Sequence, residues 1–490
     1  MPSLSVCMIV RNEAGSLPRC LESLRGVADE LVVVDTGSTD DTVAIARGFG
    51  AVCDTVTWQA DFAQARNVSL SHASKDYILV LDADEVLEPE AAAKISTCLR
   101  DFPQADGFLV HILNETDGEG VRDVEESVSV RLFRNRPHYR FHGALHEQIA
   151  ESILNTNPPG VIYDCPLHIQ HWGYTQALVK QQGKQVRNLR LAEAEWKAHP
   201  KDAFRAYNLG VEYLRNRRVG DAVVVLAVAQ QEIVSEALWA SRFYKIYCTA
   251  LMQQGSWPEA QKQLQFALSL YPDYTDLYYL LGVLRSQQQD FVGALAALAQ
   301  CIQMGDPPVP PYTVEKGLAS YRAYFAMGQV FQQLGKTAEA VAAYREAFSQ
   351  NPSFTEAFLR FGELLLLSDG SPETLAYLTG VAQLAPGQEA VLLGGALVLA
   401  GRFGLAQTYL ESTLDTREAA FFRALTYACT GQEAKLQQVM DRWDGDGSFH
   451  VLVEDHLARA GMAAVQAGLR RYPDEKVWQS LAAQFNRWLP

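Results

Sequence analysis

Basic residues and long apolar runs are both scarce in this chain of 490 residues. It contains 42 Lys and Arg against 57 Asp and Glu, which gives a formal net charge of −15. Non-specific binding to nucleic acid or to an anionic membrane needs a net basic face, which this composition disfavours. No stretch approaches the apolar length that a membrane-spanning helix requires. We therefore predict no nucleic-acid partner and no integral membrane segment.

Cysteine is sparse and unpatterned. The eight cysteines include no C-x-x-C pair, so we expect reduced, mostly buried thiols in a cytoplasmic protein. The opening "MPSLSVCMIVRNE" lacks a basic stretch and a small-residue cleavage site, and it predicts a β-strand rather than a secretion signal. A glycine-rich dinucleotide fingerprint is also missing, which disfavours NAD as a ligand.

Up to about residue 180, short β-rich runs alternate with helical patterns. Strands are predicted at 4–10, 30–35, 51–56 and 76–85, with a helix after each of the first three. Repeated units of this kind are typical of a doubly wound, parallel α/β sheet. Ligands of such sheets bind beyond the carboxyl ends of the strands.

Polar residues gather at these strand ends. Asn12 and Glu13 follow the first strand, and Asp35 ends the second. The fourth strand ends in the D-A-D segment 82–84. A helix cap would account for one of these acids and leave the others as an unfavourable cluster. A divalent cation such as Mg²⁺ or Mn²⁺, which binds carboxylates together with phosphate oxygens, would neutralise them. We therefore predict a site for a metal ion and a diphosphate at this edge.

After about residue 180 the pattern is helical and repetitive. Gly328 is followed after 12 residues by Ala340 and after 19 by Ala347. The spacing of 34 residues from Gly328 to Gly362 matches tetratricopeptide repeats, in which small residues let two antiparallel helices approach closely. Five repeats are predicted, and two degraded ones extend towards the C-terminus.

These patterns divide the chain into two predicted domains, 1–180 and 181–490, with a proline-rich insertion near 305–317 in the second. Repeat arrays form superhelices whose concave face binds peptides or proteins. A rigid spacer or a dimerisation arm is the alternative interpretation, so formation of a homo-oligomer stays open.

Four segments resemble glycosyltransferase family 2 enzymes of the GT-A fold. They are "SVCMIVRNE" (5–13), "ELVVVDTGSTDDT" (30–42), "DFAQARN" (61–67) and "YILVLDADE" (77–85). The coupling of this core to a tetratricopeptide tail is similar to the branch that includes sublancin-type peptide S-glycosyltransferases, in which "HGALHEQI" and "HIQHWGY" also have counterparts. The resemblance implies an α/β GT-A (Rossmann-like) catalytic domain followed by an all-α superhelix.

The resemblance also implies a set of donor-binding residues along the predicted rim. They are Val10, Asn12, Glu13, Asp35, Arg66, Asp82, Ala83 and Asp84. Val10, Asn12 and Glu13 would line the uridine pocket. Asp35 would accept a hydrogen bond from the base, and Arg66 would contact the nucleotide from the opposite side.

In the D-x-D segment, Asp84 would ligate a divalent metal ion, Mn²⁺ or Mg²⁺. Asp82 would lie against the ribose or the metal shell, with Ala83 between the two acids. In "HIQHWGY", His171 is a candidate further metal ligand, because neutral imidazole binds such ions. His168 lies three residues away and is expected to face the other side of a strand, so it ranks second.

In "LHEQI", Glu147 is the candidate general base, and His146 is the alternative. Displacement at an anomeric carbon needs a group that takes the acceptor's proton while the metal ion stabilises the leaving diphosphate. A basic cluster precedes this segment and either contacts a diphosphate or an acidic acceptor, or forms a solvated loop. Its members are Arg131, Arg134, Arg136 and Arg140.

Together these features predict an inverting, metal-dependent glycosyltransferase that moves a sugar from a nucleotide sugar, in the first instance a UDP-sugar, to an acceptor. The repeats could present a peptide or protein side chain as that acceptor. Two alternatives stay open, a nucleotidyltransferase on a similar fold and a non-catalytic tetratricopeptide adaptor that senses nucleotide. The residues do not determine the sugar, the acceptor or the oligomeric state.

Overall fold

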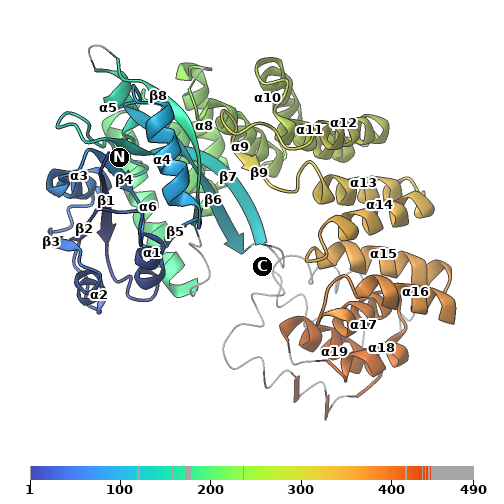
Figure 1. Ribbon diagram of the computed structural model, residues 1–490. Coiled ribbons are helices and arrows are strands. Elements are labelled where there is room, and N and C mark those ends of the chain that lie inside the picture. Colours follow the sequence, from blue (N-terminus) through green and yellow to red (C-terminus); the bar gives the residue numbers. More distant parts are fainter. Residues whose placement is uncertain are drawn as a thin grey trace. The chain divides into compact units, whose positions relative to one another are not determined.

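The structure is a computed structural model that describes residues 2–117, 122–156, 159–171, 178–235, 237–413 and 416–432, with positions 434, 435, 438, 439 and 442. The chain forms two compact units. The first comprises residues 1–117, 122–284 and 304–316, and the second comprises residues 285–303 and the chain from 317 onwards. Figure 1 labels the elements in chain order.

The first unit is built on a mixed sheet of nine described strands in the order β3-β2-β1-β4-β7-β6-β8-β5, with β9 paired to β7 (Figure 1). The strands are β1 (Leu4–Val10), β2 (Glu30–Asp35), β3 (Val52–Thr55), β4 (Tyr77–Val80), β5 (Glu85–Leu87), β6 (Gly107–Asp117), β7 (Arg122–Arg134), β8 (Ile162–His171) and β9 (Val314–Glu315).

The strands β1 to β4 pair in parallel, as their apolar runs predict. Beyond β4 the sheet becomes mixed, because β7 runs antiparallel to both β4 and β6 and β5 runs antiparallel to β8. The expectation of a parallel sheet therefore holds for the first four strands and for the pair of β6 and β8, but not for the sheet as a whole. The long antiparallel pair of β6 and β7 and the three-residue strand β5 depend on pairings between distant segments, which local periodicity does not reveal.

Helices between the strands bury apolar residues against the sheet. They are α1 (Leu17–Ser23), α2 (Thr42–Gly48), α3 (Phe62–His72), α4 (Ala91–Asp101) and the short α5 (Ala150–Leu154). In α1, Leu17, Cys20 and Leu21 are buried at helical spacing. The carboxylate of Asp61 caps α3 by accepting a hydrogen bond from the backbone N–H of Gln64 at 2.9 Å. This packing holds the carboxyl ends of β1, β2 and β4 at one edge of the sheet.

The expectation of reduced cysteines is wrong for one pair. Cys98 on α4 and Cys165 on β8 form a disulfide, with their Cα atoms 6.0 Å apart. Helix α4 packs on β8, so the two residues meet although 67 positions separate them in the sequence. The other six cysteines form no disulfide among the described residues, and four of these are buried.

Helices make up the chain after β8. In the first unit they are α6 (Leu178–Ala198), α7 (Ala203–Arg215), α8 (Val219–Glu232), α9 (Ala240–Gln253), α10 (Trp257–Leu270) and most of α11 (Thr275–Gln287). The second unit contains most of α12 (Phe291–Met304), then α13 (Tyr321–Gln333), α14 (Thr337–Gln350), α15 (Thr355–Ser368), α16 (Pro372–Ala382), α17 (Glu389–Leu399), α18 (Phe403–Leu410) and α19 (Arg417–Cys429). The last of the predicted repeats lies partly outside the described residues.

The small residues of the repeats mark close helix contacts. A Cβ atom at Gly328 would lie 2.5 Å from the ring of Tyr344, and one at Gly210 would lie 2.6 Å from Leu226. Each glycine therefore admits a large side chain of the following helix. The residues 181–284, assigned by sequence to the second domain, belong to the same compact unit as the sheet.

The proline-rich insertion is more than a loop, because it contains strand β9. Val314 and Glu315 pair antiparallel with Glu126 and Glu125 of β7. Behind this pair, Lys245 of α9 lies 2.6 Å from Asp276 and 3.0 Å from Glu315. The insertion thus contacts both strand β7 of the sheet and helix α9.

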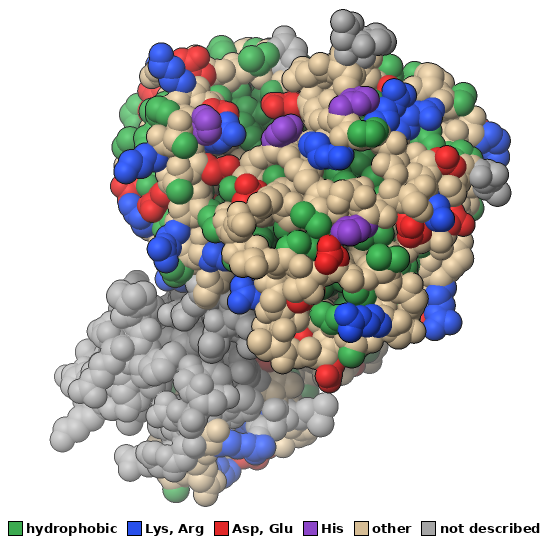
Figure 2. Space-filling view, turned by 90° about the vertical axis from the view of Figure 1, so that its left-hand side faces the viewer, with side chains coloured by type: hydrophobic (Ala, Val, Ile, Leu, Met, Phe, Trp, Pro, Cys, Tyr) green, Lys and Arg blue, Asp and Glu red, His purple; other side chains and the backbone are tan. Residues whose placement is uncertain are grey.

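The surface carries charges of both signs. Figure 2 shows one face, on which Lys and Arg side chains alternate with Asp and Glu and form no continuous basic surface over its described residues. In the part of the chain that the structure describes, no helix combines the length and apolarity needed to cross a bilayer.

Candidate active site

A cavity of about 510 Å³ opens at the carboxyl edge of the parallel strands. Most of the side chains predicted from sequence line it: Val10, Glu13, Arg66, Asp82, Ala83, Asp84, His146, Glu147 and His171. They come from the ends of β1, β4 and β8, from α3 and from the segment after β7. The structure therefore brings together residues that are far apart in the sequence.

Asp84 and His171 face each other at this cavity. His171 Nε2 lies 3.5 Å from Asp84 Oδ2, and His171 Nδ1 lies 2.8 Å from Asn114 Oδ1. The register of β5 with β8, which pairs Glu85 with His171, fixes this approach. Burial disfavours protonation of His171, but the carboxylates of Asp84, Glu85 and Asp82 outweigh it and raise the pKa of the imidazole.

Arg66 is the nearest cation to the first acid of the D-x-D segment. It lies on α3, is 6% exposed, and donates from Nη2 to Asp82 Oδ1 at 2.8 Å and from Nε to Glu147 Oε1. Burial would raise the pKa of Asp82, but Arg66 and Arg131 hold it below its usual range. Its remaining nitrogen, Nη1, is buried without a hydrogen-bond partner among the described residues.

Arg131 of β7 pairs with Glu85, the third acid of the segment 82–85. Its Nη2 lies 3.1 Å from Glu85 Oε1 and 3.6 Å from Asp82 Oδ2. Burial raises the pKa of Glu85 in spite of the charge of Arg131. The interpretation that a metal ion is needed to neutralise all these acids is therefore too simple, since two arginines already pair with Asp82 and Glu85.

Asn12 follows β1 and Asp35 is the last residue of β2, and the side chains of both accept hydrogen bonds from the loop after β2. Asp35 accepts hydrogen bonds from the backbone N–H groups of Gly37 and Ser38, both at 3.1 Å. Asn12, at a φ of 55°, accepts from the N–H of Thr39 at 2.7 Å. These side chains shape the loop, and their implied contacts with the donor stay predictions.

The segment with Glu147 and His146 is fixed by helices α3, α6 and α7. The backbone N–H of Phe62 donates to Ala144 O at 3.0 Å, and Ala144 N donates to Glu195 at 2.5 Å. His146 has a φ of 55°, and its Nε2 lies 3.4 Å from Glu212 on α7. Glu147 points the other way, to Arg66, so the two candidate bases have different partners.

Of the predicted basic cluster, only Arg131 lines the cavity. Arg136 lies 2.9 Å and Arg134 3.9 Å from Asp106, and Arg140 donates to the carbonyl of Tyr139. These three serve local structure.

Several cavity residues were missed from the sequence. They are Trp58, Phe62, Lys184, Arg187, Asn188 and Arg215. Helices α6 and α7, the first helices after the sheet, supply the last four of them. Lys184 and Arg187 lie three residues apart, which places both on one face of a helix. This spacing was the signal in the sequence that could have indicated a basic surface facing the cavity.

Comparisons with known proteins agree with this architecture. Residues 5–148 match the glycosyltransferase family 2 model, and residues 249–306 and 321–354 match tetratricopeptide repeat models. A TPR repeat-containing protein of Synechococcus elongatus is 42% identical over 214 residues, which are 43% of this chain and 52% of that protein. The chain thus spans about half the length of this relative.

A second relative is the SPbeta prophage-derived glycosyltransferase SunS of Bacillus subtilis, 25% identical over 60% of this chain and 70% of that protein. Among solved structures, glucosyl-3-phosphoglycerate synthase from Mycobacterium tuberculosis in complex with Mn²⁺ and UDP-glucose is 18% identical, with a TM-score of 0.30, over 38% of this chain and 76% of that one. The prediction of a transferase domain joined to helical repeats is confirmed. Residues 5–148 belong to a glycosyltransferase family 2 domain, and tetratricopeptide repeats follow it in the chain.

Proposed function

We propose that this protein is an inverting, metal-dependent glycosyltransferase that transfers a sugar from a UDP-sugar to an acceptor. The observation that carries the proposal is the buried Nη1 of Arg66, which has no hydrogen-bond partner among the described residues and belongs to a side chain that lines the cavity with Asp82. Guanidinium groups bind phosphate and sugar oxygens well, and a buried donor without a partner is costly. A nucleotide sugar supplies such oxygens.

The pair Asp84 and His171 suits a divalent metal ion. A carboxylate oxygen and an imidazole nitrogen, 3.5 Å apart, are donors that Mn²⁺ accepts together, and the ion would replace the present contact between them. When bound, the ion would supply charge that stabilises the diphosphate leaving group.

Within the chain, Glu147 is the proposed base. Its carboxylate faces the cavity and is held by Arg66, which fixes its orientation. Arg66 also holds Asp82, so a single side chain would position the base and the donor-binding acid together. His146, turned towards Glu212, is less well placed to take a proton inside the cavity.

The acceptor is proposed to be a peptide or protein side chain that enters along α6 and α7. These helices contribute Lys184, Arg187 and Arg215 to the cavity wall, so the first helices after the sheet already border the reaction site. For a cysteine acceptor, a lowered thiol pKa would reduce the need for a base.

A cytoplasmic location is part of the proposal. Six cysteines outside any disulfide support it, whereas the Cys98–Cys165 pair counts against it.

The test is an incubation of the full-length protein with UDP-sugars and Mn²⁺, with UDP release as the readout. A thermal-shift screen of UDP-, GDP- and dTDP-sugars first selects the donor, because ligands that bind the native state raise the melting temperature. Release of UDP that requires Mn²⁺ supports the proposal. Formation of a UDP-sugar from UTP and a sugar phosphate would identify a nucleotidyltransferase, and binding without any turnover would identify a nucleotide-sensing adaptor.

A further inference from the structure

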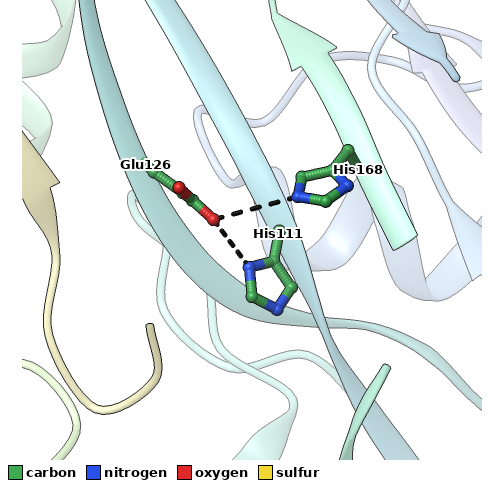
Figure 3. A group of neighbouring side chains, drawn as sticks. All are labelled: His111, Glu126 and His168. Carbon is green, nitrogen blue, oxygen red and sulfur yellow. Dashed lines mark hydrogen bonds and ion pairs between the residues drawn. The ribbon is translucent and has the colours of Figure 1, made fainter. Parts of the chain in front are cut away.

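A second group of metal-binding side chains lies on the sheet away from Asp84. His111 of β6, Glu126 of β7 and His168 of β8 point towards one another (Figure 3). His111 Nδ1 lies 2.9 Å and His168 Nε2 lies 3.9 Å from Glu126 Oε1. One donor atom from each residue lies within 4.8 Å of the others.

Strand register explains why these three side chains meet. His111 is the register partner of His168 in the parallel pair of β6 and β8. Across the antiparallel pair, His111 faces Val128, and Glu126 is two residues further along the same face of β7. The cluster is therefore built into three adjacent strands and does not depend on a loop.

This cluster is separate from the candidate active site. His168 and His171 are three residues apart on β8, which turns their side chains to opposite faces of the strand. Their neighbours differ accordingly, since His171 contacts Asp84 and Asn114 while His168 contacts Glu88.

The cluster is more buried than an ordinary ion pair on a protein surface. His111 is 6% exposed and Glu126 is 8% exposed, whereas the side chain of His168 is 33% exposed. Two of the donors are therefore sheltered from water, and the third belongs to a partly exposed side chain.

The atoms that face away from the centre are held by other groups. His111 Nε2 lies 3.1 Å from Asp164, and His168 Nδ1 lies 3.4 Å from Glu88. The second oxygen of Glu126 lies 2.7 Å from Lys316 Nζ. Imidazoles that bind metals commonly have a carboxylate at the remote nitrogen, which fixes the ring and increases its basicity.

We propose that His111, Glu126 and His168 bind a transition-metal ion of the Zn²⁺ class. Two imidazoles and one carboxylate are donors that Zn²⁺ prefers, with a solvent molecule or a further group to complete its coordination. The ion would cross-link β6, β7 and β8. Through Lys316 it would also be coupled to the insertion that contains β9, so its role is structural and lies outside sugar transfer.

The rival account is a metal-free network in which Lys316 and a protonated His111 balance the surrounding carboxylates. Zinc titration of the full-length protein separates the two accounts. The protein is freed of metal with a chelator, and Zn²⁺ binding is measured by calorimetry and by elemental analysis after dialysis. All variants carry Asp84→Asn and His171→Asn, so that the proposed catalytic metal site does not contribute.

In this background we expect a single equivalent of bound Zn²⁺. His111→Gln and His168→Gln should abolish it, and Asp164→Asn should weaken it about 10–100-fold, because only a partner of a ligand is lost. His72→Gln is the matched control, since His72 is half exposed on α3 and pairs only with Asp54 among the described residues. It should leave Zn²⁺ binding unchanged.

Absence of bound Zn²⁺ in the background protein, or equal binding after His111→Gln, would overturn the proposal. If His111→Gln does not fold, the more exposed His168→Gln decides, together with Co²⁺ absorption. A strong visible band in the background protein that is lost in His168→Gln supports the site, and a spectrum unaffected by His168→Gln contradicts it.

Discussion

Arg66 and Glu147, separated by 81 positions in the sequence, form an ion pair inside the candidate active site. The same guanidinium binds Asp82 at 2.8 Å. One buried cation therefore links the first acid of the D-x-D segment to the candidate base.

Replacing Arg66 with Met should destabilise the fold. The change leaves the carboxylates of Asp82 and Glu147 without this cation, and breaking a buried pair by removing one partner costs about 3–5 kcal/mol. Urea denaturation followed by circular dichroism measures the loss. Arg100→Met is the control, because Arg100 is exposed and pairs with its neighbour Asp101. Equal stability of the two variants would show that the Arg66 pairs contribute nothing.

Asp84→Asn should abolish metal-dependent transfer while the fold stays intact. The ion pairs of Arg66 and Arg131 go to Asp82, Glu85 and Glu147, whereas Asp84 pairs with His171. Loss of the metal ligand should lower turnover by about 10²-fold or more. UDP release at saturating Mn²⁺ measures this. Turnover like that of the unaltered protein would remove the metal from the mechanism.

Glu147→Gln should leave UDP-sugar binding unchanged and slow transfer by about 10²–10⁴-fold, as expected for loss of a general base. Calorimetric titration with the donor and a turnover assay give the two values separately. Glu151→Gln, an exposed change on α5, is the control. If Glu147→Gln weakens donor binding and leaves the turnover of bound donor unchanged, Glu147 is a binding residue and not the base.

The stability of the protein should fall in acid partly through Glu212. Burial would raise the pKa of this carboxyl, but the hydrogen bond with His146 and the charge of Arg215 lower it below its usual value. A carboxyl with a lowered pKa in the folded state stabilises the protein above the unfolded value of about 4.3. That contribution disappears as the pH falls through the lower folded value.

Unfolding free energies measured between pH 6 and pH 3 therefore should decline less steeply in Glu212→Gln than in the unaltered protein. Glu232→Gln, at an exposed position on α8, should follow the unaltered curve. Parallel curves for all three proteins would contradict the role assigned to Glu212.

Two glycine substitutions should have opposite effects on the repeats. In Gly328→Ala the new methyl group meets the buried ring of Tyr344 at 2.5 Å, and overpacking of this kind costs about 1–3 kcal/mol. In Gly380→Ala on α16 nothing lies within 4 Å, so the better helix propensity of alanine should stabilise by about 0.5–1 kcal/mol. Thermal unfolding compares them, and destabilisation by both would contradict this account of repeat packing.

Sequence patterns predicted the parts of the fold that local periodicity controls. The apolar runs at 4–10 and 30–35 became β1 and β2 with the expected ends, and Gly328 packs as its repeat position implies. Pairings between distant segments were not predictable in this way. The disulfide between Cys98 and Cys165 is one example.

The same distinction between local patterns and distant contacts applies to the candidate site. The acids at the strand ends were found because strand ends share an edge of the sheet. The ion-pair partners of these acids were not predicted, because they come from distant elements. Arg66 on α3 pairs with Asp82, and Arg131 on β7 pairs with Glu85. The contribution of α6 to the cavity was missed for a similar reason, as its basic residues resemble those of any solvated helix.

The pairing of β9 with β7 bears on how the protein is made. A ribosome synthesises β7 early, but Val314 and Glu315 emerge only after α6 to α12 have been translated. Until then Glu125 and Glu126 pair with β6 but lack their second neighbour, β9, and Lys245 lacks one of its two carboxylates. The transferase sheet therefore reaches its final form late in translation, after much of the helical array already exists.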